Sequence, residues 1–195
     1  MTTFYLIRHG TNDVLPRALA GRLPGTHLND AGRAEAERVA ERLKSKPIRH
    51  IFSSPMERAR ETAEPLARVL NLPVQISEAF NEVDFGEWQG GEVAALRNNE
   101  QWQRWIKFRS GLLIPGGEMM VDIQARVVSE LVRLTQKFPG EHIAVFSHGD
   151  PIRSALCHWL GMPLDYMTRL EILTGSINIV ALDENQSMVQ GINLL

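Results

Sequence analysis

The sequence predicts an α/β fold: a three-layer α/β/α sandwich whose central sheet is mostly parallel with an antiparallel edge. Apolar, strand-like runs alternate with segments of helical periodicity, which is the pattern of parallel strands joined by crossover helices. The last two runs are separated only by a turn, so they are expected to pair antiparallel. The 195 residues suit a single domain, 1–195, and contain no repeat or linker.

The chain begins with a strand followed by a helix. TFYLIRH, residues 3–9, is the first expected strand. The helix lies within residues 28–46, where Asn29 or Asp30 provides the cap. Its apolar residues recur at helical spacing: Ala36, Val39, Ala40 and Leu43.

A second strand and a proline-containing helix follow. IRHIFSSP, residues 48–55, is the expected strand. Pro55 is expected in the first turn of the next helix, where a missing N–H costs nothing. Pro65 is expected to break that helix and start a shorter one that runs to Leu70. The third strand is expected at residues 72–80.

The second half starts with a glycine-rich loop and then returns to regular elements. DFGEWQGG, residues 84–91, is typical of an irregular loop that carries function. A helix is expected at 102–108, where the spacing of Trp102, Trp105 and Ile106 favours a core face over a lid. A longer helix has an apolar face made of Val127, Leu131, Leu134 and Phe138. The remaining elements are a strand, a short helix and the antiparallel pair: 141–150, 151–161, 176–184 and 186–195.

The composition excludes several classes of partner. Lys and Arg number 21 against 23 Asp and Glu, so there is no positive field to bind nucleic acid or an anionic membrane surface. No apolar stretch approaches the roughly 20 residues that cross a bilayer. The lone Cys157 cannot form an intramolecular disulfide, and no secretion signal opens the sequence. We therefore expect a soluble cytoplasmic protein, whose oligomeric state stays open with a homodimer as one alternative.

Polar side chains follow two of the predicted strands at the point where each strand ends. Arg8 and His9 come directly after the first apolar run, and His148 and Gly149 come after the fourth. In open α/β sheets, ligands bind beyond the carboxyl ends of the strands. The sequence therefore predicts that two strand ends share one site.

Four features of the sequence point to a phosphoryl group. They are Arg8-His9-Gly10, Arg58 within SSPMERARETA, Glu82 within NEVDFGEWQG, and His148-Gly149. In this order, they give the chain a resemblance to the histidine phosphatase superfamily, also called the phosphoglycerate mutase-like family. GRLPGTHLNDAGRAEA, PGGE and SHGDPIR extend the resemblance over nearly the whole length. The resemblance implies the phosphoglycerate mutase-like fold and chemistry on a phosphorylated small molecule.

Two arginines and one histidine suit the first step of that chemistry. Arg8 and Arg58 offer planar, permanently charged forks that match phosphoryl oxygens, and we assign both to that group. The alternative for Arg58 is a surface ion pair, without a functional role, with Glu57 or Glu61 on its own helix. A neutral imidazole can attack phosphorus in line, so His9 is the expected nucleophile and a phosphohistidine the expected intermediate.

A carboxyl and a second histidine complete the expected catalytic set. Glu82 resembles the family's general acid/base, and apolar neighbours would raise its pKa; Asp84 and Glu87 in the same loop are the fallbacks. His148 is expected as a cation that stabilises the transition state. Gly149 lies at a helix start, where free N–H groups favour anions.

The sequence departs from the family pattern after the RHG motif. Many members have an acidic residue there and an asparagine five positions after the glycine, whereas this chain has Thr11 and Leu15. One expected phosphate donor is therefore missing. Asn12, in the substrate-binding set, or Thr11 is the expected replacement. This departure bears on substrate identity more than on the chemistry.

No metal or cofactor is expected. The remaining histidines show neither HExxH nor a similar ligand spacing: His27, His50, His142 and His158. GxxxxGK[ST], the loop that binds nucleotide phosphates, is also missing from the sequence.

These features together predict a metal-independent phosphomonoester hydrolase, and two alternatives remain. The first is a phosphoglycerate mutase-type phosphomutase. IKFRSG, residues 106–111, lacks the adjacent arginine pair with which such mutases bind a carboxylate, although Lys107 and Arg109 could partly substitute. The second is a catalytically silent module that binds phospholigands or proteins on the same fold.

Overall fold

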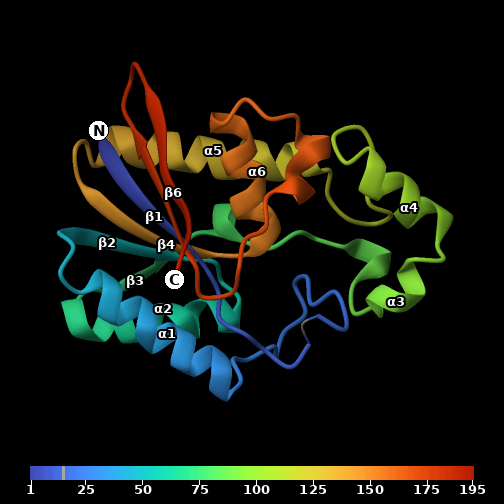
Figure 1. Ribbon diagram of the computed structural model, residues 1–195, viewed down its shortest axis with the longest axis horizontal. Coiled ribbons are helices and arrows are strands. Elements are labelled where there is room, and N and C mark those ends of the chain that lie inside the picture. Colours follow the sequence, from blue (N-terminus) through green and yellow to red (C-terminus); the bar gives the residue numbers. More distant parts are fainter. Residues whose placement is uncertain (15) are drawn as a thin grey trace.

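The computed structural model describes residues 1–14 and 16–195, and its described strands form one six-stranded sheet (Figure 1). The strand order is β3-β2-β4-β1-β5-β6. The first four strands of this order are mutually parallel. At the other edge, β5 pairs antiparallel with β1, and β6 pairs antiparallel with β5. The bounds are β1 Thr2–Arg8, β2 Ile48–Ser53, β3 Val74–Ile76, β4 His142–Ser147, β5 Ile177–Leu182 and β6 Ser187–Leu194. The predicted sheet is therefore confirmed.

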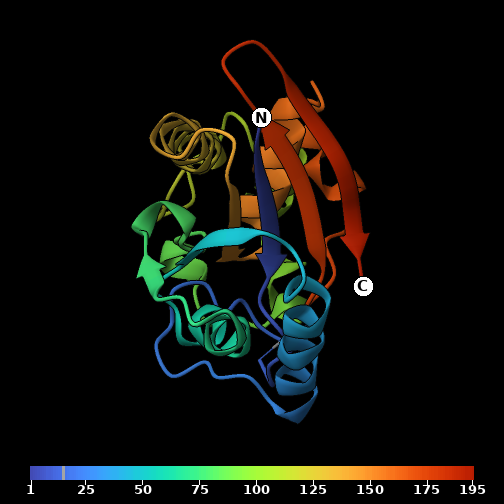
Figure 2. The same cartoon turned by 90° about the vertical axis from the view of Figure 1, so that its left-hand side faces the viewer.

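Helices cover both faces of the sheet, which confirms the three layers (Figures 1 and 2). Alternate residues of β1 enter two separate cores, because successive side chains of a strand point to opposite faces. Phe4 and Leu6 pack with α5 and α6, and Tyr5 and Ile7 pack with α1 and α2. The bounds of these helices are α1 Asp30–Leu43, α2 Glu57–Leu70, α5 Met120–Lys137 and α6 Gly149–Trp159.

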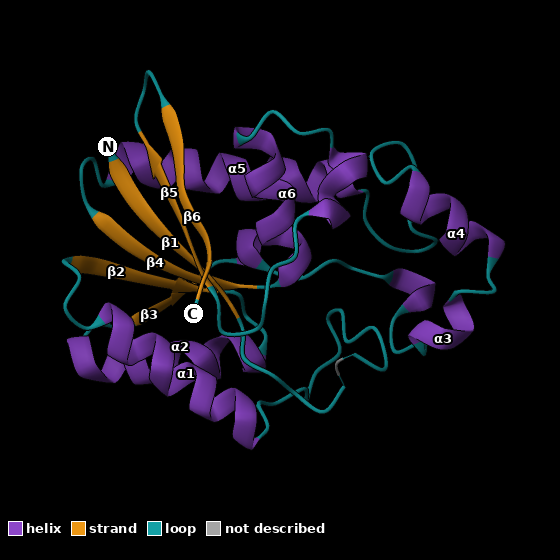
Figure 3. Ribbon diagram, in the orientation of Figure 1, coloured by secondary structure: helices purple, strands orange, loops and turns teal. Residues whose placement is uncertain are grey.

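A third core lies beyond the carboxyl ends of the parallel strands. Figure 3 shows α3 (Val93–Leu96) and α4 (Glu100–Lys107) at this end of the molecule. Trp102 and Trp105 are buried there, with ring centroids 5.2 Å apart. Ile106 is exposed and is not part of this core. The core interpretation of the tryptophans is therefore right, and the core does not extend to Ile106.

Helix α2 differs from the prediction at both of its prolines. The helix is continuous through Pro65, so the predicted break is wrong. A proline inside a helix costs about 3 kcal/mol, but Ala63 and Leu66 on either side and Pro65 itself are buried. Packing against α1 therefore outweighs the lost hydrogen bond. Pro55 precedes the helix instead of lying in its first turn, because Met56 is the N-cap.

The third strand and three short helical segments were not correctly placed by sequence pattern. Only Val74–Ile76 pairs with β2, because the chain then leaves the sheet edge and turns Phe80 into the core. Short 3₁₀ segments cover Glu78–Phe80, Gly86–Trp88 and Leu164–Arg169. Helix α3, a single turn, was also not predicted. Segments this short have no periodicity to detect.

Helix α5 is the longest helix and is amphipathic. Ile123, Val127 and Leu131 are buried, whereas Arg133 and Lys137 are exposed. In the described part of the chain, none of the helices combines the length and the apolar character needed to cross a membrane.

Candidate active site

The pairing of β1 with β4 brings the two histidine motifs together. Arg8 lies opposite Ser147 in the parallel register, so His9 and His148 each follow directly after neighbouring strand ends. The backbone N–H of His9 donates to the carbonyl of Ser147 over 2.9 Å. The imidazole centroids of the two histidines are 5.1 Å apart. The predicted sharing of one site by two strand ends is a property of the sheet register.

His9 is buried and held in one tautomer. Its Nδ1 lies 2.8 Å from the carbonyl oxygen of Gly10, and this pairing requires Nδ1–H to donate. The proton on Nδ1 leaves the lone pair on Nε2, the nitrogen that is then able to attack. Burial, reinforced by Arg58 and Arg8, lowers the pKa of His9 well below its usual value. The imidazole is therefore neutral at neutral pH, as a nucleophile must be.

Arg58 points into the site and not toward the acidic residues of its own helix. Its side chain is buried, and Nη2 donates to the carbonyl of Gly21 over 2.8 Å and to Nδ1 of His148 over 3.1 Å. Glu57 and Glu61 accept instead from backbone N–H groups of Gly25 and Leu28. The surface ion pair considered for Arg58 therefore does not form.

Arg8 is held by the segment that precedes β5. Its Nη1 donates to the carbonyl of Ile172. The side-chain nitrogens Nε of Arg8, and Nε and Nη1 of Arg58, are buried and have no hydrogen-bond partner among the described residues. Unsatisfied buried donors are costly unless a ligand or water satisfies them. Donors of this kind suit an oxyanion.

Glu82 has the raised pKa that an acid/base needs. Its Oε2 lies 3.7 Å from Nδ1 of His148, and its Oε1 accepts from the N–H of Val83 over 2.9 Å. Burial, together with the nearby charge of Asp150, raises the pKa of Glu82 to about 7, although Arg58 opposes the shift. Such a carboxyl can donate and accept a proton near neutral pH.

The two fallback carboxylates do not share this environment. Asp84 accepts from the N–H of Gly86 and lies 3.9 Å from Arg22, while Glu87 is exposed. Neither lines the cavity that contains Glu82. The geometry therefore favours Glu82 among the three.

His148 differs from the expectation of a cation. It is completely buried, and burial together with Arg58 lowers its pKa well below the usual value. Because Nδ1 accepts from Arg58, the proton resides on Nε2, which donates to Oγ of Ser54 over 2.7 Å. His148 is neutral in this structure, since the permanent charge of Arg58 already occupies the position beside it.

Most of the predicted site residues surround a cavity of about 180 Å³, but His148 is not among the residues that line it. Arg8, His9, Arg58, Glu82 and Gly149 line it, and Gly149 lies beside the guanidinium of Arg8. Four loop residues close another side: Ala18, Leu19, Ala20 and Gly21.

The two candidate replacements for the family asparagine, Asn12 and Thr11, differ in their position relative to the cavity. Asn12 is buried and lines the cavity. Thr11 is not among the lining residues, because its hydroxyl and N–H donate to the carboxylate of Glu35. Asn12 is thus the better placed of the two. Leu15, where the family asparagine is missing, lies outside the described residues.

Two lining residues were not singled out from the sequence: Asp150 and Arg153. The carboxylate of Asp150 lies 2.7 Å from Nη1 of Arg153 and 3.4 Å from Nη1 of Arg109. Burial alone would raise the pKa of Asp150, but the two guanidinium groups outweigh it and lower the pKa. The signal was present in SHGDPIR, because residues three apart in the first turn of a helix share a face.

Arg109 is not free to bind a substrate carboxylate. Its guanidinium lies 4.2 Å from the ring centroid of Trp105 and is paired with Asp150. It does not line the cavity, and Lys107 is exposed on α4. The partial substitution for a mutase-type arginine pair is therefore not supported by the arrangement of these side chains.

The charge of the site favours an anion over a metal cation. Potential ligand atoms of His9, Glu82 and His148 lie within 4.8 Å of one another, which is close enough for a metal site. However, Arg58 and Arg8 both act on these groups, and two permanent positive charges repel a divalent cation. The donor set fits an oxyanion better.

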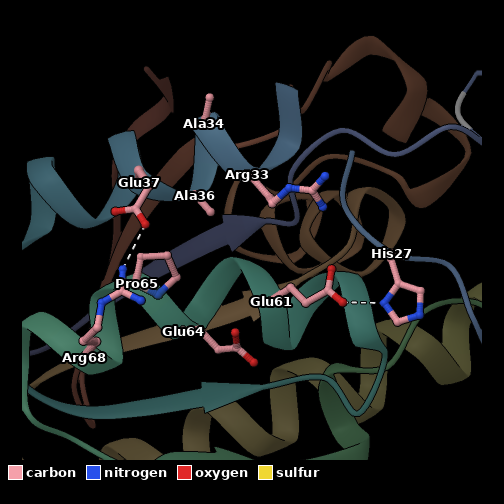
Figure 4. A pocket seen from close by; sticks show the side chains of 9 residues that line it. All are labelled: His27, Arg33, Ala34, Ala36, Glu37, Glu61, Glu64, Pro65 and Arg68. Atoms are coloured by element: carbon pink, nitrogen blue, oxygen red, sulfur yellow. Dashed lines mark hydrogen bonds and ion pairs between the residues drawn. The ribbon is translucent and has the colours of Figure 1, made fainter. Parts of the chain in front are cut away.

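A larger groove lies between α1 and α2 and contains none of the predicted site residues. It has a volume of about 590 Å³, and Figure 4 shows ion pairs between some of the charged side chains that line it. His27 pairs with Glu61, and Arg68 pairs with Glu37. Arg33, which also lines the groove, pairs with Asp30, so in the described part of the chain no unpaired guanidinium groups converge there on a phosphoryl group.

Comparisons with known proteins place the chain in a family. The model described as "Histidine phosphatase superfamily (branch 1)" matches residues 4–195. The chain therefore belongs to the histidine phosphatase superfamily, which confirms the resemblance found in the sequence.

Individual relatives agree with this family. Phosphoserine phosphatase 1 of Hydrogenobacter thermophilus is 25% identical over 100% of this chain and 93% of its own. Phosphoglycerate mutase-like protein 4 of Arabidopsis thaliana is 38% identical over 76% of this chain and 67% of its own. The solved structure of Bacillus stearothermophilus YhfR has the same fold, with a TM-score of 0.90, 24% identity, and coverage of 97% of this chain and 96% of that chain. Family and relatives indicate a phosphatase or phosphomutase-type enzyme.

Proposed function

We propose that the protein is a metal-independent phosphomonoester hydrolase that acts through a phosphohistidine on His9. The tautomer of His9 is the observation that carries this proposal: the hydrogen bond from Nδ1 to Gly10 leaves the lone pair on Nε2. Arg8 and Arg58 line the same cavity and are suited to bind the phosphoryl oxygens. No metal is needed to neutralise the transferred group, because these guanidinium groups supply the positive charge.

In the first step, Nε2 of His9 forms a bond to phosphorus as the bond from phosphorus to the ester oxygen breaks. The protonated carboxyl of Glu82 donates its proton to that oxygen, so the alcohol leaves neutral. A pKa of about 7 keeps an appreciable share of Glu82 protonated at neutral pH. His148 is neutral, so it contributes hydrogen bonds and no permanent charge.

In the second step, water attacks the phosphorus of the phosphohistidine. The carboxylate of Glu82, now ionised, accepts a proton from this water. The bond from phosphorus to Nε2 breaks, inorganic phosphate leaves, and His9 returns to its starting state. One carboxyl therefore serves as acid and then as base, which a pKa near 7 allows in both directions.

The phosphomutase alternative differs only in the acceptor of the second step. The name of the Arabidopsis relative favours it, and the name of the Hydrogenobacter relative favours hydrolysis. We favour hydrolysis because Arg109 is occupied by Asp150 and Trp105 and does not line the cavity. The small cavity of about 180 Å³ suits the phosphate ester of a small metabolite.

Release of p-nitrophenol from p-nitrophenyl phosphate in the presence of EDTA tests the proposal. We expect turnover that EDTA does not reduce. Activity lost with EDTA and restored by a divalent metal would contradict the metal-independent mechanism. A folded protein that releases nothing above background would support the silent binding module.

Trapping the intermediate tests His9 itself. We expect an acid-labile, alkali-stable phosphoenzyme in the wild-type protein and in His158→Ala, which changes an exposed histidine, but not in His9→Ala. A normal yield in His9→Ala would exclude this nucleophile. To separate phosphatase from mutase, label from a phosphorylated donor is followed into free phosphate or into a second organic product.

A further inference from the structure

Two sequence segments that carry the family resemblance contribute no charged side chain to the cavity described above: GRLPG at 21–25, of which only Gly21 lines it, and PGGE at 115–118. Each contributes a charged side chain, Arg22 and Glu118, to one cluster behind Glu82. Arg126 from α5 is the third member. These three residues are called the Glu118 cluster below.

The Glu118 cluster binds the backbone of Glu82. The carbonyl oxygen of Glu82 accepts two hydrogen bonds, one from Nε of Arg22 over 2.9 Å and one from Nη2 of Arg126 over 3.1 Å. Two guanidinium groups on one carbonyl would repel each other without a counter-charge. The pairing of two arginines therefore requires an acid nearby.

Glu118 supplies that counter-charge. Its Oε2 accepts from Nη2 of Arg22 over 2.8 Å and from Nη2 of Arg126 over 3.4 Å. The same oxygen accepts from the backbone N–H of Asp84 over 3.0 Å. Glu118 thus contacts both arginines and the loop two residues beyond Glu82.

The loop that carries Glu82 is also fastened to the loop that carries Glu118. The N–H of Glu118 donates to the carbonyl of Asp84 over 3.1 Å, and the N–H of Glu87 donates to the carbonyl of Pro115 over 2.9 Å. A Cβ at Gly117 would lie only 2.2 Å from the carbonyl oxygen of Asp84, so a glycine is required there. The two loops are therefore a closely packed unit.

The carboxyl of Glu82 itself has few anchors. Its one hydrogen bond among the described residues is from the N–H of its neighbour Val83. The direction of the side chain therefore depends on how firmly its backbone is fixed. Misplacing a reacting group by about 1 Å can cost on the order of 10²-fold in rate.

We propose that Glu118 is a positioning residue for catalysis: through Arg22 and Arg126 it fixes the backbone of Glu82 and so aims the Glu82 carboxyl at the leaving oxygen. This inference rests on the proposed role of Glu82 as general acid. A merely structural role would lower activity equally for all substrates. A positioning role affects the proton transfer, so it shows only where the leaving group needs a proton.

Glu118→Gln tests the proposal, because it keeps the shape of the side chain and removes its charge. We expect kcat to fall about 10-fold or more for an alkyl phosphate, whose leaving group needs the proton, and far less for p-nitrophenyl phosphate. The control is Glu130→Gln, which removes an acid paired with Arg133 on the same helix as Arg126. We expect this control to leave both substrates unaffected. Equal loss on both substrates in Glu118→Gln would overturn the proposal.

A double-mutant cycle shows whether Glu118 acts through Glu82. Glu82→Gln with Glu118→Gln should be no slower on the alkyl phosphate than Glu82→Gln alone, because the proton donor is already lost. Losses that multiply would overturn the positioning role. Glu118→Asp, which keeps the charge, should recover part of the alkyl phosphate activity.

Two further measurements keep this inference separate from the proposed function. If Glu82→Gln slows both substrates equally, the acid role itself fails. If Glu82→Gln is selective and Glu118→Gln is not, only the positioning role fails. Should Glu118→Gln not fold, Arg22→Gln removes the same anchor from the other side and should give the same selective loss; an equal loss on both substrates would overturn the proposal.

Discussion

The rings of His9 and His148 meet edge to face, with planes inclined by 62° and centroids 5.1 Å apart. Burial lowers the pKa of both residues well below the usual histidine value, so the pair is neutral at neutral pH. The positive charge that an oxyanion requires is therefore supplied by arginine and not by imidazolium. The arginines should thus dominate transition-state stabilisation.

Arg58→Ala should reduce kcat by on the order of 10²–10³-fold, as loss of a charge-stabilising donor does in other enzymes. The matched control is Arg68→Ala on the same helix, where the side chain is exposed and pairs with Glu37. Steady-state turnover of p-nitrophenyl phosphate measures both. Wild-type turnover in Arg58→Ala would show that this guanidinium has no part in the reaction.

Glu82 should set the alkaline side of the pH profile. In the proposed mechanism only its protonated form donates to the leaving oxygen, so phosphorylation by an alkyl phosphate should decline as the pH rises through about 7. His9 should not limit the acid side near its ordinary pKa, because that pKa is lowered and the imidazole stays neutral. Single-turnover rates across pH measure both limbs.

Glu82→Gln should remove the alkaline limb and slow alkyl phosphates more than p-nitrophenyl phosphate. Glu87→Gln, in an exposed position of the same loop, is the control. Equal slowing of both esters by Glu82→Gln would transfer the acid role to Asp84, Glu87 or water.

Asp150→Asn should move the alkaline limb to lower pH. The charge of Asp150 raises the pKa of Glu82, so its removal lowers that pKa. The freed guanidinium groups of Arg109 and Arg153 act in the same direction. The pH dependence of kcat/KM measures the shift, with Asp165→Asn as a control that loses a hydrogen-bonding acid outside the cavity. An unchanged limb would show that Asp150 does not act on Glu82.

Trp105→Ala should destabilise the fold by about 3–5 kcal/mol, the usual cost of truncating a large core side chain. Trp105 is 1% exposed and packs against Trp88 and Trp102. Ile106→Ala on the same helix should change stability by no more than about 0.5 kcal/mol. Urea unfolding measures both. A small effect at Trp105 with a large rise in KM would favour the lid interpretation instead.

The sequence predicted the sheet and the meeting of the motifs because both follow from local rules. Alternating strands and helices imply parallel pairing, and parallel strand ends share an edge. That rule brought His9 and His148 to one place before any contact was known. The order of the strands and the burial of the Arg58 side chain depend on tertiary packing, which no single motif encodes.

Where the structure differs from the prediction, the cause is again tertiary packing. Pro65 was expected to end a helix, but burial of its neighbours against α1 outweighs that local preference. His148 was expected to be charged, but its pKa is lowered by burial and by Arg58, which is distant in sequence and lies 3.1 Å away in space. Asp150 and Arg153 lie in one sequence motif, but the motif alone does not show that their ion pair lines the cavity.

The late position of β4 in the chain has a consequence for biosynthesis. This strand lies between β1 and β2 but is translated only after α5. A nascent polypeptide released from the ribosome only as far as residue 140 already carries Arg8, His9, Arg58 and Glu82, yet it lacks the strand that lies between β1 and β2 and is followed by His148. The proposed phosphate site can therefore form only after β4 has been made and has inserted between β1 and β2, which precede it in the chain, whereas β5 and β6 follow it.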